Sequence, residues 1–253
     1  MLLLLDIGNT NTHLGLADGA RVVRHVNIAT SAWSTAAGAK GLRQFVKRDR
    51  VKAACLCSVV PGATARVRAA VRKLFGISCL ELSPRTLRGV GIRYPSPETI
   101  GPDRLANAAA ANQRFGGPVV VVDFGTAVTF DVVNARGEYV GGIIAPGLAA
   151  MTDYLHERTA LLPRIQIREA SAVIGKSTEQ AMLAGAVHGY RGLIRELLKE
   201  IKAELKTRRL PVVATGGYAR LMAARLPEIT AVEPLLTLDG LRLVWEQQTI
   251  SKS

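Results

Sequence analysis

Two acidic turns with similar sequences lie about half the chain apart. The first reads LLLLDIGNT and contains Asp6, and the second reads VVVVDFGT and contains Asp123. In each, an apolar strand ends in a carboxylate followed by a turn that carries Gly and Thr. Backbone N–H groups in such turns suit phosphate, and the carboxylates suit a hydrated cation between phosphate and protein. A single turn of this kind would be read as an ordinary polar strand end, but the repeat favours a nucleotide site.

A third carboxylate, Asp103, lies at the start of an Ala-rich helix that reads PDRLANAAAANQRF. Gly101 and Pro102 mark the first turn of this helix, where the helix dipole favours a negative charge. We therefore expect Asp103 to stay ionised, as a weak base that accepts a hydrogen bond from a hydroxyl group. Two interpretations remain open: helix-end electrostatics alone, or a base at the mouth of a site with Arg104 beside it for an anionic substrate group.

The elements that position these residues follow from hydrophobic periodicity and turn signals. In the first half we predict a mixed sheet with helices against its faces. The predicted strands are Leu2–Ile7, Thr12–Leu16, Arg21–Ile28, Val51–Val60 and Ile77–Leu82, and the predicted helices are Ser34–Val46 and Pro61–Phe75. The segment Ser83–Thr99 reads as a connector.

The second half repeats the strand and hairpin pattern across Val119–Gly147, followed by a helix over Gly147–Ala160. The phrase IGKST does not form a phosphate-binding P-loop, because Ala170 stands where that motif needs Gly. It is instead predicted to begin a long helix to about Lys206, whose apolar stripe indicates core or a subunit interface. A strand over Pro211–Thr215 and a final helix over Leu238–Gln248 complete two predicted domains, residues 1–116 and 117–253.

Composition restricts the class of protein. With 253 residues, 48% of them hydrophobic, the chain can bury a sizeable core, and we expect no signal peptide, no membrane span and a cytoplasmic location. The three cysteines and four histidines are scattered, so we expect buried thiols rather than a zinc site. The net charge of +13 is read mainly as solvated helix faces with some steering of anions, and nucleic acid is not the expected partner.

An ordered set of motifs across nearly the whole chain resembles the type III pantothenate kinases. The motifs are DIGNTNTH at Asp6–His13, GPDR at Gly101–Arg104, DFGTAVTFD at Asp123–Asp131, GGIIAPG at Gly141–Gly147, GKST at Gly175–Thr178 and ATGGYA at Ala214–Ala219. The resemblance implies an α/β fold of two ribonuclease H-like halves around a nucleotide cleft, as in actin, the heat-shock ATPases and sugar kinases. It further implies a homodimer that phosphorylates pantothenate with ATP, in the first step of coenzyme A synthesis.

The resemblance also assigns roles to residues. Asp103 would accept the proton of the substrate hydroxyl, and Asp123 would hold a monovalent cation, K⁺ or NH₄⁺. Asp6 would also act on the Mg²⁺ that accompanies ATP. The residues implied for ATP are Asp6, Ile7, Gly8, Asn9, Thr10, Asn11, Thr12, His13 and Thr126, and those for pantothenate are Tyr94, Gly101, Pro102, Asp103, Arg104 and Thr178.

Some features depart from the family pattern. Pro95 and Ser96 follow Tyr94 where many members carry an Asp-Asn pair, and His13 replaces a small or β-branched residue. With the positive charge, these raise an alternative, a non-catalytic nucleic-acid-binding or regulatory protein of the same fold. Retention of all three carboxylates argues against it, and steeply salt-dependent binding to duplex DNA would support it. A kinase or phosphatase acting on another small hydroxy acid is a third hypothesis.

Overall fold

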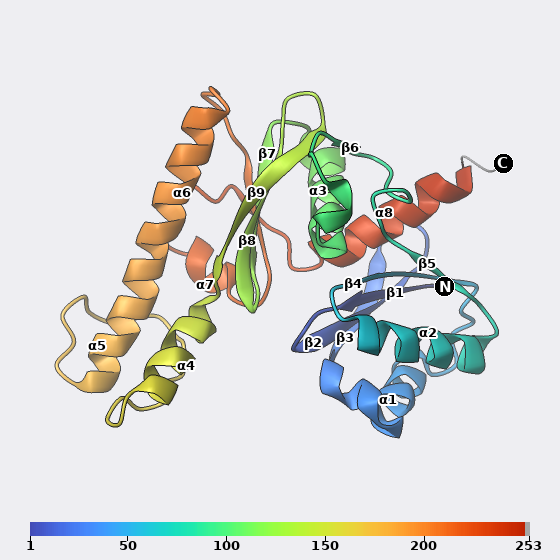
Figure 1. Ribbon diagram of the computed structural model, residues 1–253, viewed down its shortest axis with the longest axis horizontal. Coiled ribbons are helices and arrows are strands. Elements are labelled where there is room, and N and C mark those ends of the chain that lie inside the picture. Colours follow the sequence, from blue (N-terminus) through green and yellow to red (C-terminus); the bar gives the residue numbers. More distant parts are fainter. Residues whose placement is uncertain (251–253) are drawn as a thin grey trace. The chain divides into compact units, whose positions relative to one another are not determined.

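The computed structural model describes residues 1–250, and the chain divides into two compact units (Figure 1). Unit 1 comprises residues 1–117, residues 135–140 and the chain from residue 235 onwards. Unit 2 comprises residues 118–134 and 141–234. Both units are α/β with mixed sheets, which confirms the predicted fold class. The domains 1–116 and 117–253 remain a prediction, but the last helix lies with unit 1.

The sheet of unit 1 has the strand order β3-β2-β1-β4-β5. Its strands are β1 (Leu2–Ile7), β2 (Asn11–Ala17), β3 (Val22–Ala29), β4 (Ala53–Ser58) and β5 (Cys79–Glu81). The first three strands form an antiparallel meander, whereas β1, β4 and β5 run parallel. The register places Asp6 opposite His13 on one side and opposite Cys57 on the other.

Two helices, α1 (Ala36–Val46) and α2 (Pro61–Phe75), pack against one face of this sheet through a shared apolar cluster that includes Leu42 and Val67. The predicted start of the first helix at Ser34 is two residues early. Thr35 is its N-cap, with a side-chain oxygen that accepts from the Ala37 N–H at 3.2 Å, and the residues before it form a short 3₁₀ helix.

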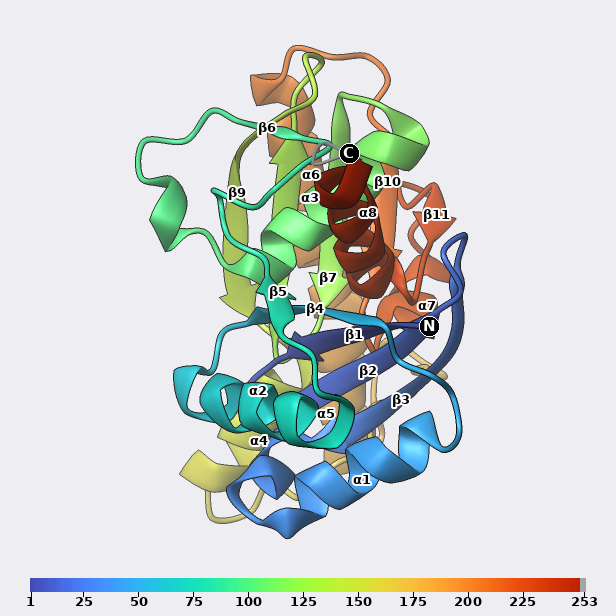
Figure 2. The same cartoon turned by 90° about the vertical axis from the view of Figure 1, so that its right-hand side faces the viewer.

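The other face of the sheet is covered by α8 (Leu236–Ile250), which packs against α3 (Pro102–Phe115), as Figure 2 shows. The approach is close because a Cβ at Gly240 would overlap the backbone of Ala106. Thr237 donates a buried hydrogen bond to the Asn107 side chain at 2.8 Å. The many Ala residues of α3 are therefore explained by packing, and they fix the helix that carries Asp103.

Unit 2 contains β7 (Val119–Phe124), β8 (Ala127–Val133), most of β9 (Glu138–Pro146), β10 (Val212–Thr215) and β11 (Ala231–Val232). The strand order is β11-β10-β7-β8-β9, and a two-residue strand of unit 1, β6 (Gly91–Ile92), pairs with the unit 1 residues at the start of β9. The strand pair β7–β8 is antiparallel, as the predicted hairpin requires, and β10 runs parallel to β7.

The helices of unit 2 are α4 (Leu148–Arg158), α5 (Thr178–Ala184), α6 (Tyr190–Glu204) and α7 (Ala219–Ala223). The predicted long helix is confirmed from Thr178 to Glu204, except that a π-helical segment, Gly185–Gly189, joins α5 to α6. Throughout residues 1–250, no helix combines the length and the apolar character that crossing a membrane requires.

Candidate active site

The first acidic turn is held from both sides. The Gly8 N–H donates to the Asn11 carbonyl at 3.0 Å, and the hydroxyl of Thr30 donates to the Gly8 carbonyl at 2.7 Å. Beneath the turn, buried Thr12 accepts a hydrogen bond from the Trp33 indole at 2.9 Å. Residues 9–11 remain exposed. The result is a rigid turn whose outer backbone faces solvent, which is the arrangement that phosphate binding requires.

Asp6 lies beside a buried thiol. Cys57 faces it across the β1–β4 pair, and the Cys57 Sγ–H donates to Asp6 Oδ1 at 3.3 Å. Burial raises the pKa of Cys57 well above its ordinary value, and the nearby charges of Asp6 and Asp103 raise it further. Asp6 and Asp103 therefore both act electrostatically on one thiol in unit 1, and Asp6 also contacts it directly. Sequence reasoning took Cys57 as a core residue only, and no signal in the chain pointed to these two neighbours.

His13, the departure from the family pattern, lies next to Asp6 in the register of β1 and β2. Its Nε2 is 3.1 Å from His25 Nδ1 on β3. Burial, and secondarily the charge of His25, lowers the pKa of His13 to about 4. His13 is thus neutral at pH 7 and adds no fixed positive charge to the turn.

Asp103 is placed as predicted, in the first turn of α3, but its electrostatics differ from the prediction. Burial is the largest influence and raises the pKa of Asp103, while the Arg104 N–H, which donates to Oδ1 at 2.9 Å, opposes the rise. A Cβ at Gly101 would lie 2.5 Å from the same Oδ1, so Gly leaves room for the carboxylate to fold back. Desolvation outweighs the helix terminus, and Asp103 is a stronger base than sequence reasoning expected.

The predicted substrate residues Tyr94 and Arg104 meet at a third residue, Tyr139. The rings of Tyr94 and Tyr139 pack edge to face with centroids 6.2 Å apart, and the Arg104 guanidinium carbon lies 5.8 Å from the Tyr139 centroid. The Arg93 N–H donates to the Tyr139 carbonyl at 2.9 Å, which extends the β6–β9 pairing. Tyr139 was missed, because a two-residue strand such as β6 leaves no periodic signal in the sequence.

The second acidic turn, in unit 2, is enclosed by two glycines. The Gly147 N–H donates to the Thr126 carbonyl at 3.1 Å, and a Cβ at Gly147 would overlap the backbone of this turn. Gly216 has φ +87°, and a Cβ there would lie 2.5 Å from Asp123 Oδ1. The glycine pair at 216–217 was predicted to allow close approach of the backbone to another group. In the structure, the group that lies close to Gly216 is the second acidic turn. Thr126 itself is exposed at the tip.

Thr178 is the first residue of α5, as predicted. Ser177 caps this helix by accepting from the Gln180 N–H at 3.2 Å, and Gln180 Oε1 accepts in return from the Lys176 N–H at 2.9 Å. The backbone of α5 leaves no room for a Cβ at Gly175. Thr178, Asp123 and Thr126 thus belong to unit 2, whereas the other predicted site residues belong to unit 1.

The carboxylates of the two acidic turns can be compared with the ligands that magnesium prefers. Within residues 1–250, no three His, Cys, Asp or Glu side chains gather so as to hold a metal ion. Mg²⁺ commonly keeps several waters and binds through one or two carboxylates together with substrate phosphates. Asp6, half-buried near the end of β1, offers such a carboxylate.

Several solved structures share the fold of the chain. Similar solved structures include a protein of Campylobacter jejuni named for the Baf family of transcriptional activators, with 19% identity, a TM-score of 0.62 and coverage of 98% of this chain and 99% of that one. Another is the inorganic polyphosphate/ATP-glucomannokinase of Arthrobacter, with 15% identity, a TM-score of 0.52 and coverage of 97% and 98%. At these low identities the likeness establishes the α/β fold alone.

The sequence comparisons identify the family. A family model of type III pantothenate kinases matches residues 2–200. Proteins named type III pantothenate kinase are similar to the chain at 47% identity in Akkermansia muciniphila, over 95% of this chain and 96% of that protein, and at 41% in Geobacter sulfurreducens, over 98% and 99%. The chain belongs to the type III pantothenate kinase family, which confirms the resemblance inferred from the motifs.

Proposed function

We propose that the protein transfers the γ-phosphoryl group of ATP to the terminal hydroxyl of pantothenate and so forms 4′-phosphopantothenate, the first step of coenzyme A synthesis. The observation that carries the proposal is that Asp6, which accepts a hydrogen bond from the buried Cys57 thiol, and Asp103 both raise the pKa of that thiol in unit 1. One carboxylate follows the phosphate-type turn, and the other is a base with a raised pKa. Family membership supplies the substrate.

Phosphoryl transfer passes through a loose, in-line transition state, so the protein chiefly positions the reactants and neutralises charge. We assign the backbone of residues 6–13 and Thr126 to the ATP phosphates, with Asp6 directed to Mg²⁺ through its water shell. Asp123 is assigned to the monovalent cation, K⁺ or NH₄⁺, as the family resemblance implies. The magnesium ion, when bound, neutralises phosphate charge as the bond to the leaving group breaks.

On the acceptor side, Asp103 accepts a hydrogen bond from the pantothenate hydroxyl and then its proton. Because proton loss comes late in a loose transition state, orienting this hydroxyl is a large part of its contribution. Arg104 is assigned to the pantothenate carboxylate, and the contact of Arg104 with Tyr139 restricts the guanidinium on one side. Tyr94, Gly101, Pro102 and Thr178 complete the proposed substrate site.

We also propose a homodimer and a cytoplasmic location. Unit 2 has an apolar hollow of about 830 Å³ between α4 and the α5 segment. Exposed Met151, Tyr154 and Leu155 lie along it. Such a surface suits an interface between copies of the chain. Tyr154→Glu should shift the protein toward monomer in sedimentation velocity, while exposed Tyr94→Phe should not.

The test of function is direct. Purified protein is incubated with Mg-ATP and pantothenate, with and without K⁺ or NH₄⁺, and 4′-phosphopantothenate is measured by mass spectrometry. Product that depends on pantothenate and on a monovalent cation supports the proposal. No product under any salt would reject it. The nucleic-acid-binding alternative is not favoured, because the chain belongs to a kinase family over nearly its full length.

A further inference from the structure

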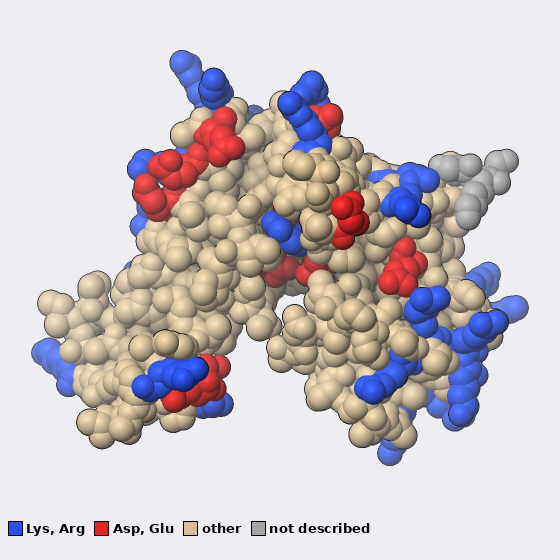
Figure 3. All heavy atoms as spheres, viewed as in Figure 1, with Lys and Arg blue, Asp and Glu red and all other residues tan. Residues whose placement is uncertain are grey.

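The positive charge of the chain is concentrated in one segment. Residues 21–73 contain twelve Lys or Arg and a single acidic residue, Asp49, so they carry +11 of the net +13. This segment forms β3, α1, β4 and α2, all in unit 1. Lys and Arg side chains gather over α1 and α2 with few acidic ones among them, at the lower right of Figure 3. Most of the excess charge therefore belongs to this one segment, which is compatible with the solvated helix faces and anion steering expected from the sequence.

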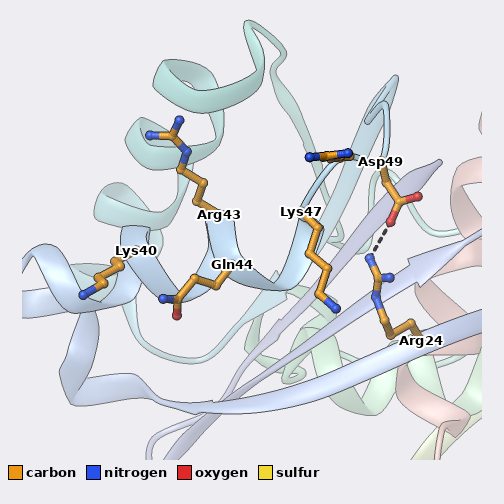
Figure 4. Close-up of a pocket in the computed structure, with 7 residues that line it drawn as sticks. Arg24, Lys40, Arg43, Gln44, Lys47 and Asp49 are labelled. Carbon is orange, nitrogen blue, oxygen red and sulfur yellow. Dashed lines mark hydrogen bonds and ion pairs between the residues drawn. The ribbon is translucent and has the colours of Figure 1, made fainter.

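Five of these cations line one hollow of about 740 Å³ between β3 and α1. Four belong to α1 and the turn that follows it, and the fifth, Arg24, comes from β3. The helix residues recur at the spacing of one helical face, with Lys40, Arg43 and Lys47 three and four positions apart. In Figure 4, Lys47 extends from the end of α1 toward Arg24, whereas Lys40 and Gln44 point away from Arg24 and Arg43 lies on the other side of the helix.

Arg24 is fixed in place. It forms an ion pair with Asp49, donates to the Phe45 carbonyl at 2.9 Å and lies 5.3 Å from the centroid of the Phe45 ring. Its Nε atom is buried and has no hydrogen-bond partner among the described residues. Arg24 thus neutralises the single acidic group of the hollow, and nothing in the lining compensates the other four cations.

Those four cations, Lys40, Arg43, Lys47 and Arg48, form no ion pair with any residue in the described part of the chain. The negative end of the helix dipole accounts for cations in the last turn of α1, where each gains roughly 0.3–1 kcal/mol, but not for Lys40 in mid-helix. Lys47 also has φ +55°, a backbone conformation that is unfavourable for a residue with a Cβ. Like charges held together in this way repel one another unless an anion binds between them.

We propose that this hollow is a second anion site, separate from the proposed ATP site, and that it binds a small polyphosphate. Adjacent phosphates need several cations at once, and both Lys and Arg bind them through charge-assisted hydrogen bonds. The volume suits a small molecule. The lining contains no aromatic residue on which a base could stack, so the phosphate chain is the recognised group, whether it is inorganic or the tail of a nucleotide.

The test uses the full chain at fixed ionic strength with Mg²⁺ but without ADP or pantothenate, because excess ADP would itself occupy the proposed phosphate site; any binding at the proposed catalytic site is then common to all the proteins compared. Inorganic tripolyphosphate is titrated in by calorimetry against the wild type and Lys40→Gln/Lys47→Gln. The matched control is Lys202→Gln/Lys206→Gln, which removes the same charge from exposed positions at the end of α6 in unit 2. Kinase activity of both variants should equal that of the wild type, which confirms that they fold.

We expect one tripolyphosphate per chain in the hollow, about tenfold or more weaker in the Lys40/Lys47 variant and within about twofold of wild type in the control. ATP is then titrated in the same medium. An affinity for the hollow equal to that of tripolyphosphate identifies the phosphate chain as the ligand, and much tighter binding of ATP there identifies a nucleotide source. Equal weakening in both variants, or no binding beyond the catalytic site, would overturn the proposal. The proposal would also be overturned if a 20-base-pair DNA duplex displaced tripolyphosphate and if both variants weakened DNA binding equally.

Discussion

Asp103 shows how burial changes the chemistry of a side chain that the sequence locates correctly. Its position at the start of α3 predicted an ionised carboxylate, but desolvation outweighs the helix terminus and raises its pKa. The folded chain therefore binds a proton at Asp103 more readily than the unfolded chain. Between the two pKa values folding takes up protons, so the ionised carboxylate opposes folding at neutral pH.

Asp103→Asn is accordingly expected to lower kcat at least about 100-fold, to leave the Kd for ATP unchanged and to raise the free energy of unfolding at pH 7. The stability gain should vanish below about pH 4, where the unfolded carboxyl is protonated too. Steady-state kinetics, ATP titration and urea unfolding at several pH values measure these. Wild-type turnover would remove Asp103 from the mechanism.

His13, on β2, makes the stability of the fold depend on pH in the opposite direction from Asp103. Its pKa is lowered to about 4 by burial and by His25, so the unfolded chain binds the proton more readily between about pH 4 and pH 6.5. Stability due to this residue is complete above the unfolded pKa and is lost as the pH falls toward 4.

We therefore expect the free energy of unfolding to fall by up to roughly 2 kcal/mol between pH 7 and pH 4.5 on account of His13. His13→Val should flatten this part of the profile. His25→Gln should flatten it only in part, because burial is the larger cause. Identical profiles for the wild type and His13→Val would show that His13 is not the titrating group.

Cys57 acts through Asp6, as a positioning residue. The Sγ–H donor contacts one carboxylate oxygen, so Cys57→Ala should remove one of the contacts that orient Asp6 and lower kcat by roughly tenfold, whereas Cys57→Ser keeps a donor and should retain most activity. Comparison of KM and kcat between the two variants tests whether the hydrogen bond of residue 57, and not its packing, supports catalysis. Equal losses in Ala and Ser variants would indicate a packing role instead.

At the scale of elements, the glycines around the second acidic turn matter more than its carboxylate for local stability. Gly216→Ala combines a positive φ with a Cβ 2.5 Å from Asp123 Oδ1, and we expect a loss of about 1–3 kcal/mol in unfolding free energy together with weaker ATP binding. Gly217→Ala is the matched control, because nothing lies within 4 Å of a Cβ there. Similar stability for both variants would refute this account of the turn.

Elements with strong local signals could be predicted from the sequence. The strands β1 and β7 each begin with four consecutive apolar residues, α2 has Pro61 at its start, and the capping residues of α5 lie at 177–180 as expected. The site residues at these signals were predicted with them. Tyr139 and the approach of Cys57 to Asp6 could not be, since both depend on pairing between segments far apart in the chain. The π-helical segment at Gly185–Gly189 likewise has no distinct sequence period.

At the scale of the whole molecule, residues that carry charge and residues that carry the proposed chemistry occupy different parts of the sequence. Segment 21–73 holds nearly all of the excess positive charge, while the carboxylates at 6, 103 and 123 lie outside it. Averaging charge over the chain concealed this division. The grouping of the cations became visible only in the structure, where Arg24 of β3 lies beside the basic residues of α1.

The return of α8 to unit 1 sets an order for events during translation. Gly240 and Thr237 dock on α3, so one face of the first sheet stays uncovered until α8 has been synthesised. By then every residue of unit 2 has been synthesised. Unit 1 is thus the first unit to be synthesised and the last to complete its fold. In a nascent chain arrested before residue 235, Leu4 and Gly15 would be accessible to chaperones because α8 would not yet cover them.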